Sequence, residues 1–303
     1  VRWQEANSGL TDSLHAVAYG GGTFLALGSG GRTFVSTDGL SWRAGSVLPR
    51  SVYTVTYGAG QFLVAGTNHL YASADASHWT GRTLSDTTRI GGLQHTTAGF
   101  LVLGEATSGT YWRSTNGTDW TQLSISVGAN GSLSALTAGN GWYVGVGSAS
   151  KSLLVSLDGS NWTGSGTGTA WNFTAAAAGP GAIMVGGSNG WAVQVPDTGT
   201  VSLSNNVGVP FANQVNDLAY GAGVFVAVGA QGQVSNFAAG PYWQTRTSGT
   251  SADLQGVNFV NGRFLAVGAN GTIITSAEGI GWAPRTSGTS QTLRATAFGA
   301  ATY

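Results

Sequence analysis

Hydrophobic residues along this chain come in short runs separated by glycine- and asparagine-rich turns, and the pattern is clearest between residues 254 and 282. There it predicts four strands, at residues 254–259, 264–267, 272–276 and from Trp282 onward. The turns between them contain Asn-Gly and Glu-Gly pairs, which favour tight reversals between antiparallel strands. We therefore expect an antiparallel four-stranded meander as the building block of the chain.

The same pattern recurs along the whole chain with a period of about 40 residues. A tryptophan opens the fourth strand of most copies, at Trp3, Trp42, Trp79, Trp120, Trp162, Trp243 and Trp282. The gap between Trp162 and Trp243 is about twice the others, so one copy lacks this tryptophan, and residues 201–204 are predicted to supply its strand. Second strands such as residues 225–229 are continuous apolar runs, which is typical of central strands covered on both faces.

A single meander cannot bury both of its faces, so consecutive copies are expected to pack on one another around an axis, which is the architecture of a β-propeller. We expect an all-β, single-domain propeller over residues 1–303 with seven four-stranded antiparallel blades. The alternative is eight blades with an incomplete last blade, because residues 2–9 look like an extra fourth strand and residues 293–299 like an extra first strand. In the seven-bladed case, residues 2–9 would close the last blade by pairing with residues 272–276, and residues 282–303 would form a tail.

A short motif separates the third and fourth strands of several copies, as in Ser36-Thr-Asp-Gly-Leu-Ser-Trp42. Ser and Asp side chains can accept hydrogen bonds from nearby backbone N–H groups, Gly supplies a positive φ, and Trp can cover the hairpin. The motif therefore predicts a structural turn. The residues assigned to it are Ser36, Asp38, Trp42, Asp75, Trp79, Trp120, Asp158, Trp162 and Trp282.

This motif resembles the Asp-box, or BNR, repeat of sialidase-like and photosystem-assembly-factor-like propellers, with a turn that is one residue shorter. The resemblance covers nearly the whole chain, and the segment Trp243-Gln-Thr-Arg-Thr-Ser-Gly-Thr250 looks like the repeat of bacterial propeller arrays. In that family the box is a folding element remote from the active site. The resemblance thus implies that Asp38, Asp75, Asp158 and Glu278 are not catalytic.

Composition narrows the possible partners. Only 8% of the residues are charged, the formal net charge is +0, and Lys151 is the single lysine, so the clustered positive charge that nucleic acids and anionic membranes require is missing. No apolar run is long enough for membrane insertion. Cysteine is absent and the four histidines share no ligand spacing, so we expect neither a metal nor a cofactor. The Gly/Ser/Thr/Asn-rich balance favours a secreted, periplasmic or cell-surface bacterial protein.

The acids outside the turn motif are scattered over different copies, whereas a glycosidase needs two carboxylates roughly 5–10 Å apart. We therefore expect no catalytic residues, and a glycosidase is the least favoured reading. His15 and His95 fall in first strands, where a packed or axis-lining imidazole is favoured over a zinc ligand.

Two loops between copies break the repeat and give the candidate ligand-binding residues. One loop places Trp171 beside Asn172, the other contains Phe211 and Asn213, and Trp191 belongs to the copy between them. An aromatic surface among amides suits a sugar ring or a protein partner equally, while the alternative is that the tryptophans fill space left by the missing box tryptophan. Because no polar–aromatic set recurs in every copy, we favour a non-catalytic scaffold that binds proteins through its loop faces. A lectin-like carbohydrate binder is the alternative.

Overall fold

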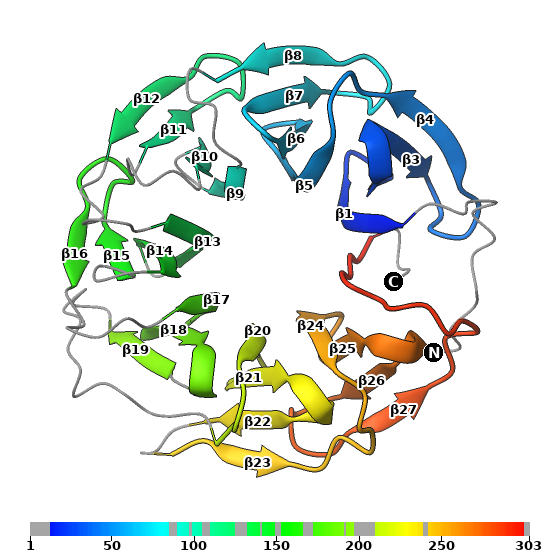
Figure 1. The fold of residues 1–303 in the computed structure, drawn as a ribbon, viewed down its shortest axis with the longest axis vertical. Coiled ribbons are helices and arrows are strands. Elements are labelled where there is room, and N and C mark those ends of the chain that lie inside the picture. The colour runs from blue at the N-terminus through cyan, green and yellow to red at the C-terminus, as the bar shows by residue number, and fades with distance from the viewer. Residues whose placement is uncertain are drawn as a thin grey trace. The chain divides into compact units, whose positions relative to one another are not determined.

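The computed structural model describes residues 13–84, 90–96, 99–104, 110–124, 132–139, 141–148, 153–165, 172–190, 192–196, 210–238 and 242–299. It confirms the predicted fold class, a seven-bladed β-propeller of antiparallel blades (Figure 1). The described residues between 13 and 124, together with residues 295–299, belong to one compact unit, and those between 132 and 294 belong to a second. No helix in this part of the chain is long and apolar enough to cross a membrane.

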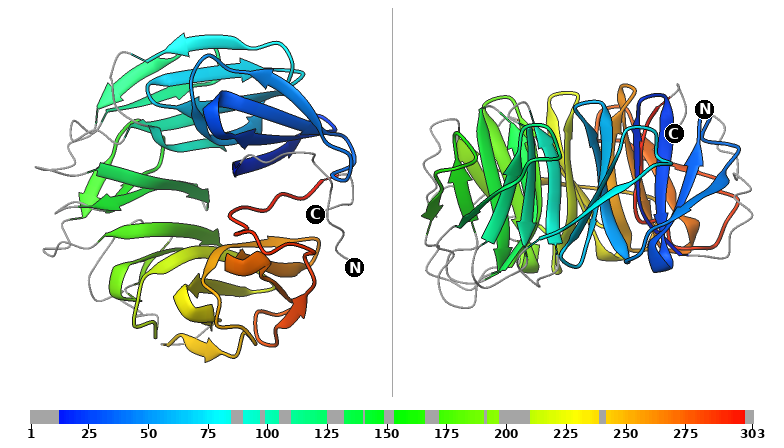
Figure 2. Two further views of the ribbon diagram at one scale, coloured as in Figure 1. Left: turned by 45° about the vertical axis from the view of Figure 1, so that its right-hand side comes forward. Right: turned by 90° about the horizontal axis from the view of Figure 1, so that it is seen from above.

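The first unit contains the first three blades, each with four strands in chain order, and Figure 2 shows their up-and-down meanders from two further directions. The strands are β1 (Leu14–Gly20), β2 (Thr23–Gly28), β3 (Arg32–Ser36) and β4 (Arg43–Val47); β5 (Val52–Gly58), β6 (Gln61–Gly66), β7 (His69–Ser73) and β8 (Thr80–Thr83); β9 (Ile90–Thr96), β10 (Gly99–Gly104), β11 (Thr110–Ser114) and β12 (Thr121–Ser124).

The second unit contains blades four to seven. The strands are β13 (Ser132–Gly139), β14 (Trp142–Ser148), β15 (Leu153–Ser156) and β16 (Thr163–Ser165); β17 (Phe173–Gly179), β18 (Ala182–Gly187) and β19 (Ala192–Pro196); β20 (Val215–Gly221), β21 (Val224–Gly229), β22 (Val234–Phe237) and β23 (Gln244–Arg246); β24 (Leu254–Val260), β25 (Arg263–Gly268), β26 (Ile273–Ser276) and β27 (Ala283–Arg285). The strand expected at residues 201–204 of the fifth blade lies outside the described residues.

Within the described ranges, short 3-10 turns join the second and third strands of four blades: η1 (Ser29–Gly31), η2 (Ser188–Gly190), η4 (Ala230–Gly232) and η5 (Ala269–Gly271). The second strands are among the most buried elements, and every residue of β10, β18 and β21 is buried. This burial explains their continuous apolar sequences. First strands of consecutive blades pack together within each unit, β1 on β5 and β5 on β9 in one, and β13 on β17, β17 on β20 and β20 on β24 in the other.

The packing of first strands depends on a glycine in one blade and a ring in the next. A Cβ atom on Gly20 would lie 1.9 Å from Cγ of Tyr57, and one on Gly58 would lie 2.0 Å from Cγ of His95. Real Cβ atoms do not approach other carbons this closely, so a side chain at either glycine would push the blades apart. His95 thus has a packing role, and its ring centroid lies 4.6 Å from that of Phe100.

The C-terminal segment takes part in the same kind of contact. Within the first unit, Gly299 lies against the ring of Tyr19, where a Cβ atom would be 2.0 Å from Cγ. Residues 293–299 were expected to resemble a first strand, and Gly299 packs on Tyr19 as Gly20 packs on Tyr57.

The seventh blade is completed by its own residues. Thr275 of β26 lies opposite Ala283 of β27, and the ring centroid of Trp282 is 6.3 Å from that of Phe264 in β25. The expectation that residues 2–9 pair with residues 272–276, leaving residues 282–303 as a tail, is therefore wrong. The edge of β26 on which they would have paired already carries β27.

Candidate functional site

The acids of the repeated turn are engaged by the backbone. In the first blade, Asp38 Oδ1 accepts hydrogen bonds from the N–H groups of Ser41 at 2.7 Å and Leu40 at 2.8 Å. Ser36 Oγ accepts from Gly39 N–H at 2.9 Å and donates to Asp38 Oδ1 at 2.9 Å. These donors stabilise the carboxylate and lower the pKa of Asp38 to about 2, with the Ser41 N–H contributing most. Asp38 is therefore a turn residue that stays ionised.

The same geometry recurs in other blades. Backbone N–H groups two and three residues further on bond to Asp75 and Asp158, and they hold the pKa of both carboxyls far below the usual range. In the third blade Asn116 takes the place of the acid, and its Oδ1 accepts from the N–H groups of Thr118 at 3.0 Å and Asp119 at 2.9 Å. An amide oxygen can therefore take the place of the carboxylate in this turn, so the negative charge is not required.

The box tryptophans cover these turns. Trp42 Nε1 donates to Gly39 O at 3.0 Å, and its ring centroid lies 6.2 Å from that of Phe24 in the second strand. Trp282 lies in the corresponding place beside Phe264 and packs against the core cluster between the sixth and seventh blades. Trp79, Trp120 and Trp162 are half-buried like Trp42 and Trp282.

The candidate ligand-binding residues are placed unequally by the structure. Trp171 and Trp191 lie outside the described residues. Asn172 and Asn213 are exposed, and the carbonyl of Asn172 accepts the N–H of Ser188 at 2.9 Å. The ligand-binding role of this set stays a prediction.

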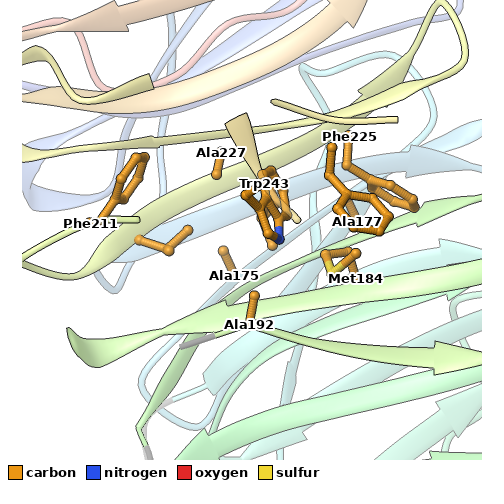
Figure 3. Close-up of a cluster of buried hydrophobic side chains, with 11 residues drawn as sticks. Ala175, Ala177, Met184, Ala192, Phe211, Phe225, Ala227 and Trp243 are labelled. Carbon is orange, nitrogen blue, oxygen red and sulfur yellow. The ribbon is translucent and has the colours of Figure 1, made fainter. Parts of the chain in front are cut away.

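Phe211 is a core residue. It is 5% exposed and belongs to a cluster that includes Ala175, Met184, Phe225 and Trp243, formed between the fifth and sixth blades (Figure 3). The small side chains of the alanine-rich strand β17 leave room that larger rings from the next blade fill. Phe211 therefore fills space in the core, as the alternative interpretation proposed for the tryptophans, and its ring is not presented at the surface.

One half-buried acid has a different environment from the turn acids. Asp217 lies in β20, and its carboxylate accepts the N–H groups of Leu218 and of Val257 in β24, both at 2.9 Å. Loss of hydration raises the pKa of Asp217 to about 6, against the lowering effect of the two hydrogen bonds. This carboxyl joins the first strands of two blades. Among the described residues, no group of three or more His, Asp and Glu side chains is placed to hold a metal.

A shallow, open cavity of about 490 Å³, lined by polar and apolar surface in about equal parts, lies at the seventh blade, in the second unit. It is lined by residues 249–250 of the loop after β23, by residues 270–274 and by residues 284–290. Most of its polar lining residues are Ser and Thr, joined by Asn270 and by one charged residue, Arg285. The sequence motif Arg-Thr-Ser-Gly-Thr occurs in both loops, but periodicity alone did not indicate a cavity between them.

The two loops beside this cavity, residues 247–250 and 286–291, are called the rim loops. Ser287 Oγ donates to Thr289 O at 3.1 Å and Thr289 Oγ1 accepts from Gln291 N–H at 3.1 Å, while Gly271 N–H donates to Gln291 O at 2.8 Å. Ser248 and Thr250 repeat the first of these bonds in the other loop, also at 3.1 Å. Both rim loops are therefore held by internal hydrogen bonds.

The blades and their turns define a β-propeller, and comparisons with known proteins give the same class. No model of a known protein family matches the sequence, and the curated proteins contain no significant match to it. Among solved structures, the computationally designed Ika8 protein is similar with a TM-score of 0.70 and 17% identity, over 94% of this chain and 87% of that chain.

Two further structures are similar at lower identity. Streptogramin B lyase has a TM-score of 0.69 and 13% identity, over 92% of this chain and 95% of that chain. YCF48 bound to D1 peptide has a TM-score of 0.59 and 13% identity, over 78% of this chain and 81% of that chain. At such identities the likeness shows a shared fold.

Proposed function

We propose that this protein is a non-catalytic binding module that contacts protein partners through its loop faces, in a secreted, periplasmic or cell-surface setting. The observation that carries the proposal is the pair of rim loops, which are fixed by their own hydrogen bonds beside a shallow, open cavity. Groups that are ordered before association lose less entropy on binding, so a rim of this kind favours recognition.

The acids of the turns support a binding role over catalysis. Asp38, Asp75 and Asp158 are hydrogen-bonded to backbone N–H groups and have lowered pKa values, so they are poorly suited to donate a proton near neutral pH. We also propose that these turns are a shortened form of the Asp-box. Trp171, Asn172, Trp191 and Asn213 remain proposed contact residues.

The fold itself serves both binding proteins and enzymes, as the names of the similar structures illustrate. YCF48 is a propeller with a bound D1 peptide, which supports a peptide or protein as the kind of partner to test first. The choice between classes rests on the rim loops and the turn acids of this chain.

Parallel binding assays on a peptide array and a glycan array would test the proposal. We expect saturable binding to a subset of peptides, no selective binding to a glycan class, and no hydrolysis of aryl glycosides. Asp38→Asn is a matched control, because it lies in a turn and is expected to leave peptide binding unchanged. Saturable binding to one glycan class without peptide binding would favour the lectin alternative, and glycoside turnover would favour an enzyme.

A further inference from the structure

Two arginines at equivalent positions in the sixth and seventh blades are held differently. In the sixth blade, Arg246 Nε donates to Asn236 Oδ1 at 2.7 Å, and its Nη2 donates to the side-chain oxygen of Gln244. Asn236 and Gln244 lie opposite one another on β22 and β23. Two neutral amide side chains thus engage the guanidinium of Arg246.

In the seventh blade one of these partners is missing. Arg285 Nε donates to Thr275 Oγ1 at 3.0 Å, as Arg246 does to Asn236. Ala283 occupies the place of Gln244, opposite Thr275. The Nη groups of Arg285 consequently have no acceptor among the residues that the structure describes.

The environment of Arg285 is suited to an anionic group. Arg285 is half-buried and lines the cavity, and no Asp or Glu is among the lining residues. A guanidinium that is partly removed from water is stabilised when a carboxylate accepts its N–H groups. The planar fork of Arg also matches the two oxygens of a carboxylate.

The strand beside the cavity disfavours binding by the addition of a partner strand to the edge of the sheet. Pro284 lies in the middle of β27, the edge strand of the seventh blade, and it has no backbone N–H to donate to an added strand. Since backbone pairing is disfavoured at this edge, we expect a partner to be recognised there by side chains that line the cavity.

We propose that this cavity binds a carboxylate of a protein partner, with the Nη groups of Arg285 as its charged donors. The proposal rests on the proposed function and names the chemistry that the seventh blade would recognise. The carboxylate is either the C-terminus of the partner or an Asp or Glu side chain, since both present the same pair of oxygens.

Three peptides of Gly, Ser and Ala, each carrying an uncharged fluorophore on its N-terminal amine, distinguish these sources. One has a free C-terminal carboxylate, one has a C-terminal amide, and one has a C-terminal amide and a central Glu. We expect the neutral amide to bind at least about 10-fold more weakly by fluorescence anisotropy than one or both carboxylate peptides. The better of the two identifies the source of the carboxylate.

Variants of the protein locate the site. Arg285→Gln is expected to weaken binding of the carboxylate peptide about 10- to 100-fold, because a charged hydrogen-bond donor is lost. Arg246→Gln removes the same charge from the adjacent blade, where the guanidinium is already engaged, and is expected to change the affinity less than 2-fold. The two variants together separate a local contact from a general effect of net charge.

Ala283→Gln is the sharper variant, because it retains the charge of Arg285. The introduced amide oxygen can accept a hydrogen bond from an Nη group of Arg285, as Gln244 does from Arg246. Because it competes with the carboxylate, we expect it to weaken carboxylate binding about 3- to 10-fold. It also tests the proposal if Arg285→Gln fails to fold.

The proposal is wrong if the neutral amide binds as well as both carboxylate peptides, or if none of the three binds. It is also wrong if Ala283→Gln and folded Arg285→Gln bind like the parent. Peptide-array binding that survives these changes would leave the proposed function standing, whereas glycan binding without peptide binding would remove both.

Discussion

The ring of Phe259 lies directly on the backbone of Gly221, so that a Cβ atom at Gly221 would be 1.9 Å from Cγ of the ring. Gly221 ends the first strand of the sixth blade, and Phe259 belongs to the first strand of the seventh. The same ring is 4.8 Å from that of Phe264, measured between centroids. The absence of a side chain at Gly221 therefore sets how closely the first strands of these two blades approach.

Gly221→Ala is expected to lower the free energy of unfolding by about 1–3 kcal/mol, because the added methyl group overpacks the contact with Phe259. Urea denaturation monitored by tryptophan fluorescence measures the change. Gly281→Ala is the control, since a Cβ atom there would have nothing within 4 Å. A Gly221→Ala variant as stable as the parent would contradict the packing argument, as would strict additivity with Phe259→Ala.

Asp38→Asn is expected to preserve the turn at neutral pH and to reduce the loss of stability in acid. Since the folded-state pKa of Asp38 is lowered to about 2, its contribution is fully present above about pH 4 and is lost as the pH falls toward 2. Asn116 shows that an amide oxygen can accept the same bonds. Melting temperatures between pH 2 and pH 7 test this, and parallel pH profiles for parent and variant would exclude a contribution from Asp38.

Asp217→Asn is expected to act in the opposite direction. Burial raises the pKa of Asp217 to about 6, so the folded state binds more protons than the unfolded state between about pH 4 and pH 6. Its contribution to stability therefore falls as the pH rises through this window, by on the order of 2 kcal/mol. Chemical denaturation at pH 4 and pH 6.5 should show this fall in the parent and not in the variant. An equal fall in both would assign it to other groups.

Trp42→Ala is expected to destabilise the fold by about 3 kcal/mol, because it removes a half-buried ring that covers the turn and packs beside Phe24. Trp42→Phe keeps most of the packing and removes the bond from Nε1 to Gly39 O, so a smaller loss of about 1 kcal/mol is expected. Thermal melting ranks the three proteins. Peptide binding by the folded variants should match the parent, and a binding defect would show that Trp42 also contacts a partner.

The strands and turns were predictable because their signals are local. Apolar runs such as Phe264-Leu-Ala-Val-Gly268 recur along the chain beside glycine-rich turns, and the Ser-x-Asp-Gly motif contains its own hydrogen-bond acceptors. Closure of the seventh blade was not predictable in this way. Both Trp3 and Trp282 open a segment with the pattern of a fourth strand. Because both segments fit the repeat equally well, the period alone does not indicate which of them pairs with β26.

The candidate site was harder to predict because it depends on neighbours in space. Phe211 stands in a polar loop and was expected to be presented to a ligand, but the small residues of β17 in the preceding blade give it a buried position. Arg285 shares its motif with Arg246, so the sequence around the two looks equivalent. Only the pairing across β26 and β27 shows that Ala283 leaves the guanidinium of Arg285 without the second partner that Arg246 has.

The glycine contacts between first strands also restrict how such a chain can be rearranged by duplication or grafting. Gly139 faces the methyl group of Ala178, whereas Gly179 and Gly221 face the rings of Tyr220 and Phe259. Val260 takes the corresponding register position in the seventh blade, opposite Arg263 at the end of the hairpin. A transplanted blade must therefore match the residue at this one position to the ring or methyl group of the blade that follows it, whatever the rest of its sequence.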